Sequence, residues 1–191
     1  FVGLDKVKLK NNFIVKDNPE IYLDFNSIAK GFGIDVIARF LESKKTTNYL
    51  VEIGGEVRAS GLNREDNPWR LGIEEPSLVQ QSVQRVVALT DQAIATSGDY
   101  RNYFEENGTR FSHTFDPTSG RPIKHNIASV SVVADNAAAA DALATALNVL
   151  GEEAALKLSE TENIAAYFIL YDNESSESKY RVVFSSAFSP Y

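Results

Sequence analysis

The sequence contains no cysteine and no methionine among its 191 residues. Without cysteine, a disulfide, a thiolate nucleophile and a zinc–thiolate site are all excluded. A natural gene product begins with methionine, so the first residue, Phe1, indicates a processed or engineered piece of a longer protein. No apolar run approaches the roughly 20 residues that a membrane-spanning helix needs, and no signal peptide is recognisable. We therefore expect no membrane span within this segment.

Positive charge is also scarce. Lys and Arg number 19 against 26 Asp and Glu, which gives a net charge of −7. No basic stripe is available to displace counterions from phosphates, which argues against a nucleic-acid partner. Hydrophobic residues at 43% and charged residues at 24% are typical of a globular protein. The length predicts one domain over residues 1–191 with a substantial core.

Short strands separated by turn residues dominate the predicted secondary structure. The first two strands, 7–15 and 21–24, are expected on either side of the turn signal Asp17-Asn18-Pro19, and Gly54-Gly55 is expected to join two further strands in a hairpin. The two strands of that hairpin are 48–53 and 56–60. The other predicted strands are 69–74, 85–90, 93–96, 127–134, 164–170 and 180–184.

Three longer segments predict helices. Apolar residues recur at a spacing of 3.6 over residues 27–43, with Asn26 or Ser27 as the N-terminal cap. Gly31 and Gly33 each weaken that helix by roughly 1 kcal/mol relative to alanine, so we expect close approach of another backbone or a ligand there.

An alanine-rich helix is predicted from residue 135 or 136 to Gly151, a second over 152–160, and a short helical turn within 99–106. These helices are segregated among runs of consecutive strands. That order predicts an α+β fold with a largely antiparallel sheet.

Within the alanine-rich helix, Asp141 and Thr145 are four residues apart and therefore lie on one face. Two hard oxygens on a rigid element suit Mg²⁺, with phosphate and water completing its coordination. Such a pair also occurs by chance, and a solvated surface pair is the more common explanation when it stands alone.

Other motifs accompany this pair. They are DFNSIAKG (24–31), VEIGGE (51–56), TSGDYR (96–101), SHTFDPTSGRP (112–122) and ADALAT (140–145). Together they resemble the FAD:protein FMN transferases, the ApbE family, from about Tyr22 to Gly151. Two departures are conservative: Glu56 and Ser119 stand where relatives often carry Asp and Thr.

The resemblance implies that Asp24, Lys30 and Phe115 bind FAD. A helix N-terminus beside its pyrophosphate, with Lys30 as a point charge, is a favourable anion site. The resemblance also implies a Mg²⁺ site.

Its implied ligands are Asp141, Thr145 and Ser27, the last through its backbone carbonyl. His113 is the implied general base that deprotonates an acceptor hydroxyl, a role that suits a side chain titrating near neutral pH.

Each motif also has a structural explanation. Asp24, Ser27 and Lys30 fit a strand end, a helix cap and a surface lysine; Gly54-Gly55 fits a plain hairpin turn, and His113 a satisfied structural histidine. Residues 96–99 fit a strand-to-turn junction.

The implied activity is Mg²⁺-dependent transfer of FMN from FAD to a Thr or Ser hydroxyl, with release of AMP. The implied acceptor is a flavoprotein subunit of a membrane redox complex. Two alternatives stay open: a Mg²⁺-dependent FAD pyrophosphatase and a non-catalytic flavin-binding domain. We expect a C-terminal portion that lacks an N-terminal flavin-binding part, with little activity alone. Many relatives are exported lipoproteins of bacteria, which implies the periplasm or cell envelope and a membrane anchor in the missing N-terminal segment.

Overall fold

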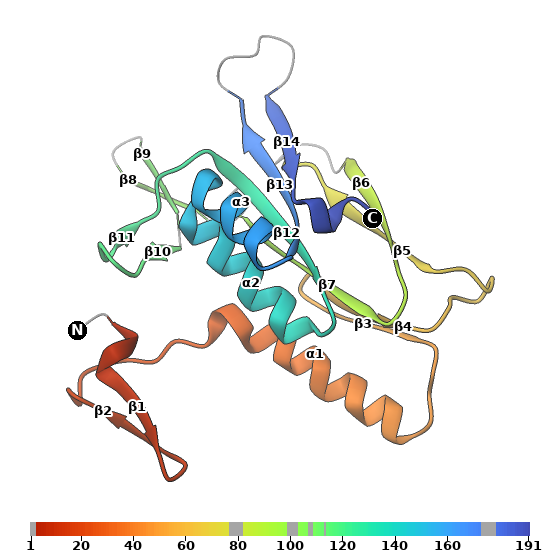
Figure 1. The fold of residues 1–191 in the computed structure, drawn as a ribbon, viewed down its shortest axis with the longest axis horizontal. Coiled ribbons are helices and arrows are strands. Elements are labelled where there is room, and N and C mark those ends of the chain that lie inside the picture. The colour runs from red at the N-terminus through yellow and green to blue at the C-terminus, as the bar shows by residue number, and fades with distance from the viewer. Residues whose placement is uncertain (1–2, 77–81, 99–102, 107–108, 113, 173–178) are drawn as a thin grey trace.

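The computed structural model describes residues 3–76, 82–98, 103–106, 109–112, 114–172 and 179–191. Its helices are α1 (Asn26–Ser43), α2 (Ala137–Leu150) and α3 (Glu152–Thr161), with 3-10 turns η1 (Leu4–Lys6) and η2 (Ser186–Phe188) (Figure 1). The strands are β1 (Val7–Lys10), β2 (Phe13–Lys16), β3 (Tyr49–Ile53), β4 (Glu56–Ser60), β5 (Trp69–Glu74), β6 (Val83–Leu89), β7 (Gln92–Gly98), β8 (Tyr103–Glu106), β9 (Thr109–Ser112), β10 (Phe115–Asp116), β11 (Arg121–Pro122), β12 (Ile127–Ala134), β13 (Ala165–Tyr171) and β14 (Tyr180–Phe184).

A six-stranded sheet forms the centre, in the order β14-β13-β12-β7-β4-β3, and every neighbouring pair is antiparallel. The predicted α+β class with an antiparallel sheet is therefore confirmed. Gly54 and Gly55 join β3 to β4 with φ of 62° and 100°, a conformation that favours glycine.

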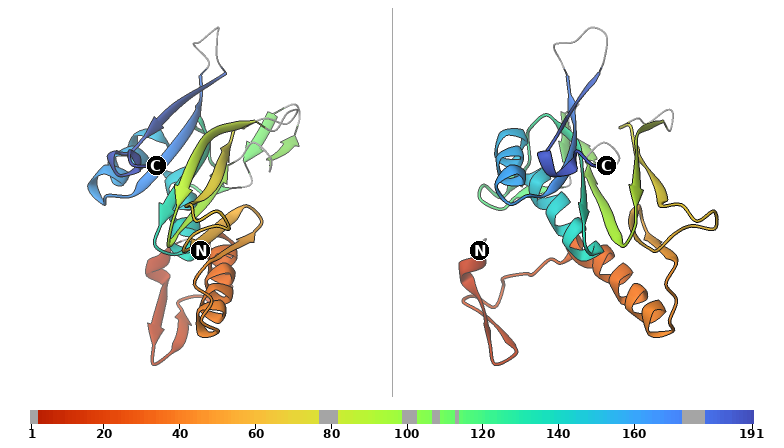
Figure 2. Two further views of the ribbon diagram at one scale, coloured as in Figure 1. Left: turned by 90° about the vertical axis from the view of Figure 1, so that its right-hand side faces the viewer. Right: turned by 45° about the vertical axis from the view of Figure 1, so that its right-hand side comes forward.

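Both faces of the sheet are covered. The β5–β6 hairpin and η2 pack on one face, and α2 with α3 pack on the other (Figures 1 and 2). Along β13, Tyr167 and Ile169 join the first core cluster, whereas Ala166, Phe168 and Leu170 join the second. A strand buried on both faces reads as a continuous apolar run, which is what this segment shows.

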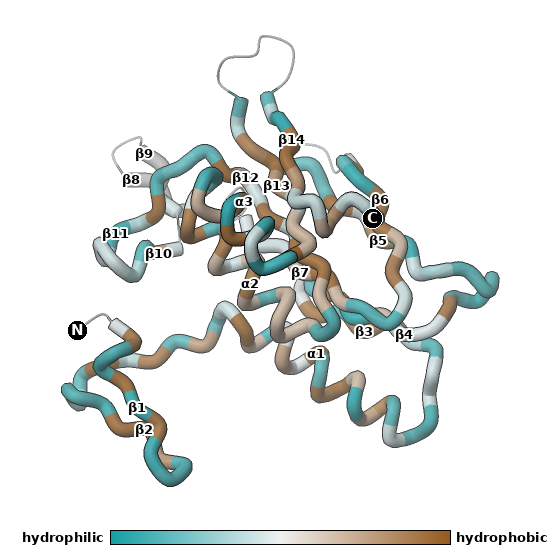
Figure 3. The backbone as a smooth tube through the Cα atoms, in the orientation of Figure 1, coloured by the Kyte–Doolittle hydropathy of each residue, from teal (hydrophilic) through white to brown (hydrophobic). Residues whose placement is uncertain are grey.

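Helix α1 packs on α2, β3 and β4. Its buried residues are Gly31, Ile34, Asp35 and Ala38. The large apolar residues that predicted the helix lie mostly outside this contact: Phe32, Val36, Ile37 and Phe40 are 42–59% exposed. Figure 3 shows these hydrophobic segments along α1 and along the β1–β2 hairpin, as well as in the central strands.

Near the N-terminus the predicted strands are wrong in detail. The β1–β2 hairpin turns at Asn11 and Asn12, with φ of 50° and 64°, and residues 21–24 form no strand. A two-residue turn with both φ positive matches the twist of a hairpin, and asparagine tolerates that region better than most residues. The Asp17-Asn18-Pro19 signal lies after this hairpin.

Two further expectations are corrected. Residues 103–106 belong to strand β8 rather than a helical turn, paired with β9; residues 99–102 lie outside the described part. The N-cap of α1 is Phe25, which makes no side-chain capping hydrogen bond, and not Asn26 or Ser27 as predicted. Just before it, Asp24 Oδ1 accepts the backbone N–H of Asn26 at 2.8 Å. None of the described helices is both long enough and apolar enough to cross a bilayer.

Candidate functional site

A cavity of about 420 Å³ opens where the N-terminus of α1 meets α2, β4, β7 and β10. Most of the residues that line it carry polar side chains. The lining residues are Asp24, Asn26, Ser27, Lys30, Glu56, Thr96, Ser97, Gly98, Thr114, Phe115, Asp141 and Thr145. Six of the seven residues predicted for the site thus share one cavity, although they come from three separate motifs. The seventh, His113, lies outside the described residues, next to Thr114.

Asp141 and Thr145 both face this cavity from α2. Asp141 is only 5% exposed, and its Oδ2 accepts the backbone N–H of Gly31 on α1 at 3.0 Å. Burial raises the pKa of Asp141, while the Gly31 amide and the Lys30 charge pull the other way. One carboxylate oxygen is therefore committed to orienting the side chain, and Oδ1 accepts no hydrogen bond from the described residues.

Glu56 is a site residue to which the sequence assigned no role. It is the first residue of β4 and is 2% exposed, with Oε1 2.6 Å from the Lys30 Nζ. Burial raises the pKa of Glu56; Lys30 opposes that shift, and the negative charge of Asp141 adds to it. Its Oε2 is buried without a hydrogen-bond partner in the described structure. The register of the β3–β4 hairpin turns this side chain inward. That register is the only signal that could have identified Glu56 as a site residue from the sequence.

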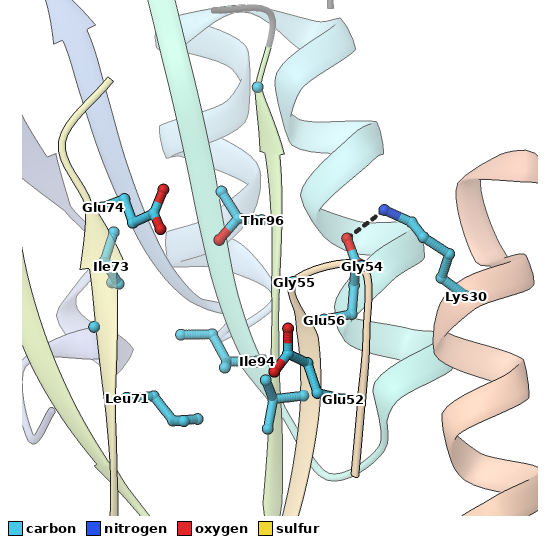
Figure 4. Close-up of a pocket in the computed structure, with 13 residues that line it drawn as sticks. Lys30, Glu52, Gly54, Gly55, Glu56, Leu71, Ile73, Glu74, Ile94 and Thr96 are labelled. Carbon is cyan, nitrogen blue, oxygen red and sulfur yellow. Dashed lines mark hydrogen bonds and ion pairs between the residues drawn. The ribbon is translucent and has the colours of Figure 1, made fainter. Parts of the chain in front are cut away.

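A second cavity, of about 350 Å³, adjoins the first. It shares Lys30, Glu56, Thr96 and Gly98 with the first cavity and extends between the β3–β4 hairpin and β5. Figure 4 shows Lys30 reaching across to Glu56 at one end, with Leu71, Ile73 and the carboxylate of Glu74 at the other. The apolar lining residues of this cavity are Leu71, Ile73, Ile94 and Val57. Lys30 and Glu56 line both cavities, so a ligand that occupied both would pass beside this charged pair.

Hydroxyl groups from β7 complete the polar wall. Thr96 Oγ1 lies 2.7 Å from Ser131 Oγ, and Ser97 Oγ accepts from Asn148 Nδ2 at 3.2 Å. Asn148 is fully buried on α2, and its Oδ1 has no partner among the described residues. It follows Asp141 by seven residues, so it continues the same helical face toward the sheet.

The donor set suits a hard divalent cation. Asp141 Oδ1 and the Thr145 hydroxyl are oxygen ligands of the kind that Mg²⁺ accepts, and the unpartnered Glu56 Oε2 lies in the same wall. The described residues include no group of three or more His, Cys, Asp or Glu side chains that could hold a metal ion by themselves. A cation here would therefore complete its coordination with Ser27, substrate oxygens and water.

Two residues predicted to bind FAD, Asp24 and Phe115, lie at the mouth of the cavity. Asp24 Oδ1 accepts the Asn26 N–H, and its Oδ2 lies 3.3 Å from Asn26 Nδ2, so the first amide of α1 is occupied. A phosphate would therefore meet Lys30 rather than that amide. Phe115 is 53% exposed on β10 and offers an aromatic face at the cavity edge.

A model of the ApbE family matches residues 1–168. The chain belongs to the ApbE family. The five motifs that suggested this family are thereby supported, and the match extends beyond them to the N-terminal hairpin and into β13.

Members of the ApbE family are similar over most of this chain. FAD:protein FMN transferase of Vibrio cholerae is 46% identical over 189 residues, covering 99% of this chain and 55% of that protein. The Haemophilus influenzae FAD:protein FMN transferase is 47% identical, covering 89% of this chain and 51% of that protein. The chain spans about half the length of these relatives.

Solved ApbE structures share the fold. The flavin transferase ApbE from Vibrio cholerae superposes with a TM-score of 0.88 at 44% identity, covering 99% of this chain and 59% of that one. The ApbE protein from Thermotoga maritima gives 0.85 at 27% identity, covering 98% and 59%. The fold is thus retained at an identity well below that of the Vibrio relative.

Proposed function

We propose that the full-length protein transfers the FMN part of FAD to a Thr or Ser hydroxyl of an acceptor protein, with Mg²⁺, and releases AMP. The observation that carries this proposal is the convergence of Asp141, Thr145 and Lys30 on one cavity. The names of the similar proteins, FAD:protein FMN transferase, supply the substrate.

Metal ligation and phosphate binding are assigned to different residues of the cavity. Ser27, Asp141 and Thr145 hold the Mg²⁺, which when bound neutralises charge on the pyrophosphate. Lys30 lies in the wall of both cavities and orients the pyrophosphate as a point charge. In this arrangement Lys30 exchanges its contact with Glu56 for one with phosphate.

The transfer step is a displacement at phosphorus. His113 accepts the proton of the acceptor hydroxyl, a role taken from the family resemblance. The hydroxyl oxygen bonds to the FMN phosphorus, and the bond from that phosphorus to the bridging oxygen breaks. AMP departs with the bridging oxygen. Phe115 and Asp24 border the cavity and bind FAD at its mouth.

The decisive experiment incubates full-length protein with FAD, Mg²⁺ and a candidate acceptor, such as a flavoprotein subunit of a membrane redox complex. We expect the acceptor mass to rise by one FMN, with an equal amount of AMP released. An acceptor whose target Thr or Ser is changed to Val or Ala serves as the control and gains no mass. If AMP is released but the acceptor gains no mass, the protein is a FAD pyrophosphatase and not a transferase. If neither AMP nor labelled acceptor forms, the protein is a non-catalytic flavin-binding domain.

We further propose that residues 1–191 are the C-terminal part of this enzyme and that a preceding segment supplies flavin contacts. Support comes from the half-length match and from exposed apolar side chains on the hairpin and α1, including Leu9 and Phe13 at 74% and Phe40 at 59%. Exposed apolar side chains gathered on an element can mark a surface that another segment or protein covers. The same segment is our proposed anchor in the periplasm or cell envelope.

We expect residues 1–191 alone to show little or no FMN transfer under conditions in which the full-length protein labels its acceptor completely. Acceptor mass after equal incubation times measures this difference, and circular dichroism verifies that the shorter chain is folded. Transfer by the folded shorter chain at the full-length rate would contradict the expectation.

A further inference from the structure

Helices α1 and α2 exchange carboxylate–amide contacts in both directions. Asp141 of α2 accepts the Gly31 N–H of α1. In return, Asp35 of α1 accepts the first two amides of α2: Oδ1 lies 3.0 Å from Ala137 N, and Oδ2 lies 2.9 Å from Ala138 N. The first exchange lies in the proposed cation site, whereas the second lies outside the residues that line it.

Asp35 is held as an ion. It is 3% exposed, and Arg58 donates to its Oδ1 at 2.8 Å. Burial alone would raise the pKa of Asp35, but the Ala138 and Ala137 amides and Arg58 together leave the pKa below its ordinary value. The first amides of a helix have no partner within the helix and carry partial positive charge, so a buried carboxylate is stabilised there.

The two contacts determine how the helices sit against each other. Gly31 and Asp35 are one turn apart on α1, and Ala137 and Asp141 are one turn apart on α2, so the helices are joined at two points. Between these points the backbones nearly touch, because a Cβ added at Gly31 would lie 2.2 Å from the Ala137 carbonyl oxygen. Neither helix can slide or rotate without breaking a buried contact.

This arrangement matters for the site because the proposed ligands come from both helices. Ser27 lies one turn before Gly31 on α1, and Thr145 one turn after Asp141 on α2. We propose that Asp35 is a positioning residue for the cation site: it touches neither cation nor FAD, and it sets the α1–α2 register that brings Ser27 to Asp141 and Thr145. This inference rests on the proposed function only in requiring a cation at that site.

The test measures Mn²⁺ binding to the full-length protein without FAD, by electron paramagnetic resonance, well below the melting temperature. We expect Asp35→Asn to raise the Kd about 10- to 100-fold, the usual effect of losing a group that orients metal ligands. The spectrum of the bound ion should also change. A residue that only stabilises the fold would lower the melting temperature and leave both the Kd and the spectrum of folded protein unchanged.

Glu42→Gln is the matched control. Glu42 lies on the same helix and also accepts from Arg58, at 3.2 Å, yet it makes no hydrogen bond to α2 in the described structure. We expect its Kd for Mn²⁺ to equal that of the unaltered protein. If Asp35→Asn does not fold, Arg58→Lys disturbs the same carboxylate more gently and should weaken binding in the same direction.

The outcomes separate the two claims. If folded Asp35→Asn binds Mn²⁺ with the same Kd as the unaltered protein, this inference alone is overturned. The same holds for Arg58→Lys where that variant is used in place of Asp35→Asn. Weakening by Glu42→Gln as large as that by Asp35→Asn would overturn it too. No Mn²⁺ binding by the unaltered protein would also overturn this inference, which requires a cation site that the protein forms without FAD. The acceptor-labelling experiment tests the proposed function separately.

Discussion

Changing Asp141 to Asn in the full-length protein should abolish Mg²⁺ binding and slow FMN transfer by ~10³-fold, since the cation contributes several kcal/mol to the transition state. Asparagine keeps an oxygen that can accept the Gly31 N–H at the present Oδ2 position. The geometry of α1 and α2 is thereby preserved while the charge is lost. Acceptor labelling measures the rate, and isothermal titration measures Mg²⁺ affinity.

The stability of Asp141→Asn, unlike its activity, should not fall. Burial raises the pKa of Asp141 above its value in the unfolded chain. Stability from this group is therefore fully present below the unfolded pKa and is lost as the pH rises through the folded pKa. At neutral pH the ionised carboxylate costs stability, so Asp141→Asn should melt at the same temperature or higher.

Calorimetry at pH 7 with and without Mg²⁺ separates these effects. A ligand that binds the native state raises the melting temperature, so Mg²⁺ should stabilise the unaltered protein and leave Asp141→Asn unaffected. A variant that still gains stability from Mg²⁺, or that transfers FMN at the normal rate, would show that Asp141 is not a metal ligand.

Changing Gly31 to Ala should destabilise the fold by about 1–3 kcal/mol or more, because the added methyl overpacks the contact between two helices. Its Cβ would lie 2.2 Å from the Ala137 oxygen and 2.8 Å from the Ala138 Cα, and backbone cannot move aside as a flexible side chain can. The helices must separate, so Mg²⁺ affinity should fall as well. Urea denaturation gives the free energy of unfolding.

Gly33→Ala is the control, two residues along the same helix. Its Cβ would lie 3.4 Å from the Ile53 Cδ1, an ordinary contact with the end of a side chain. Since alanine favours a helix over glycine by roughly 1 kcal/mol, this variant should be as stable as the unaltered protein or more so. If both variants lost stability equally, close packing at Gly31 would not be the reason for its glycine.

The residues that the sequence proposed for a site lie around one cavity, whereas the packing around that cavity was predicted less well. Asp141 and Thr145 could be paired from helical spacing alone, and the family motifs added Ser27 and Lys30. Glu56 could not be assigned a role, because its burial depends on hairpin register and on a lysine 26 residues away. Long-range partners of this kind leave no local pattern.

Helix α1 illustrates the same limit for the fold. Its apolar spacing correctly predicted a helix, but Phe32 and Phe40 are exposed while Gly31 and Asp35 are buried. Close approach at Gly31 was predicted from its cost to the helix, and the neighbour proves to be the α2 backbone. At Gly33 no other backbone lies close, and an added Cβ would meet only the end of the Ile53 side chain. Which face packs is decided by the partner helix, and the partner is not encoded in the spacing.

Anomalous diffraction from full-length protein crystallised with FAD and Mn²⁺ tests the central claim most directly. The account predicts a peak within coordination distance of Asp141 Oδ1, the Thr145 hydroxyl and the Ser27 carbonyl, with a pyrophosphate oxygen beside it. FAD bound with its pyrophosphate elsewhere, or an ion that touches neither Asp141 nor Thr145, would contradict the account.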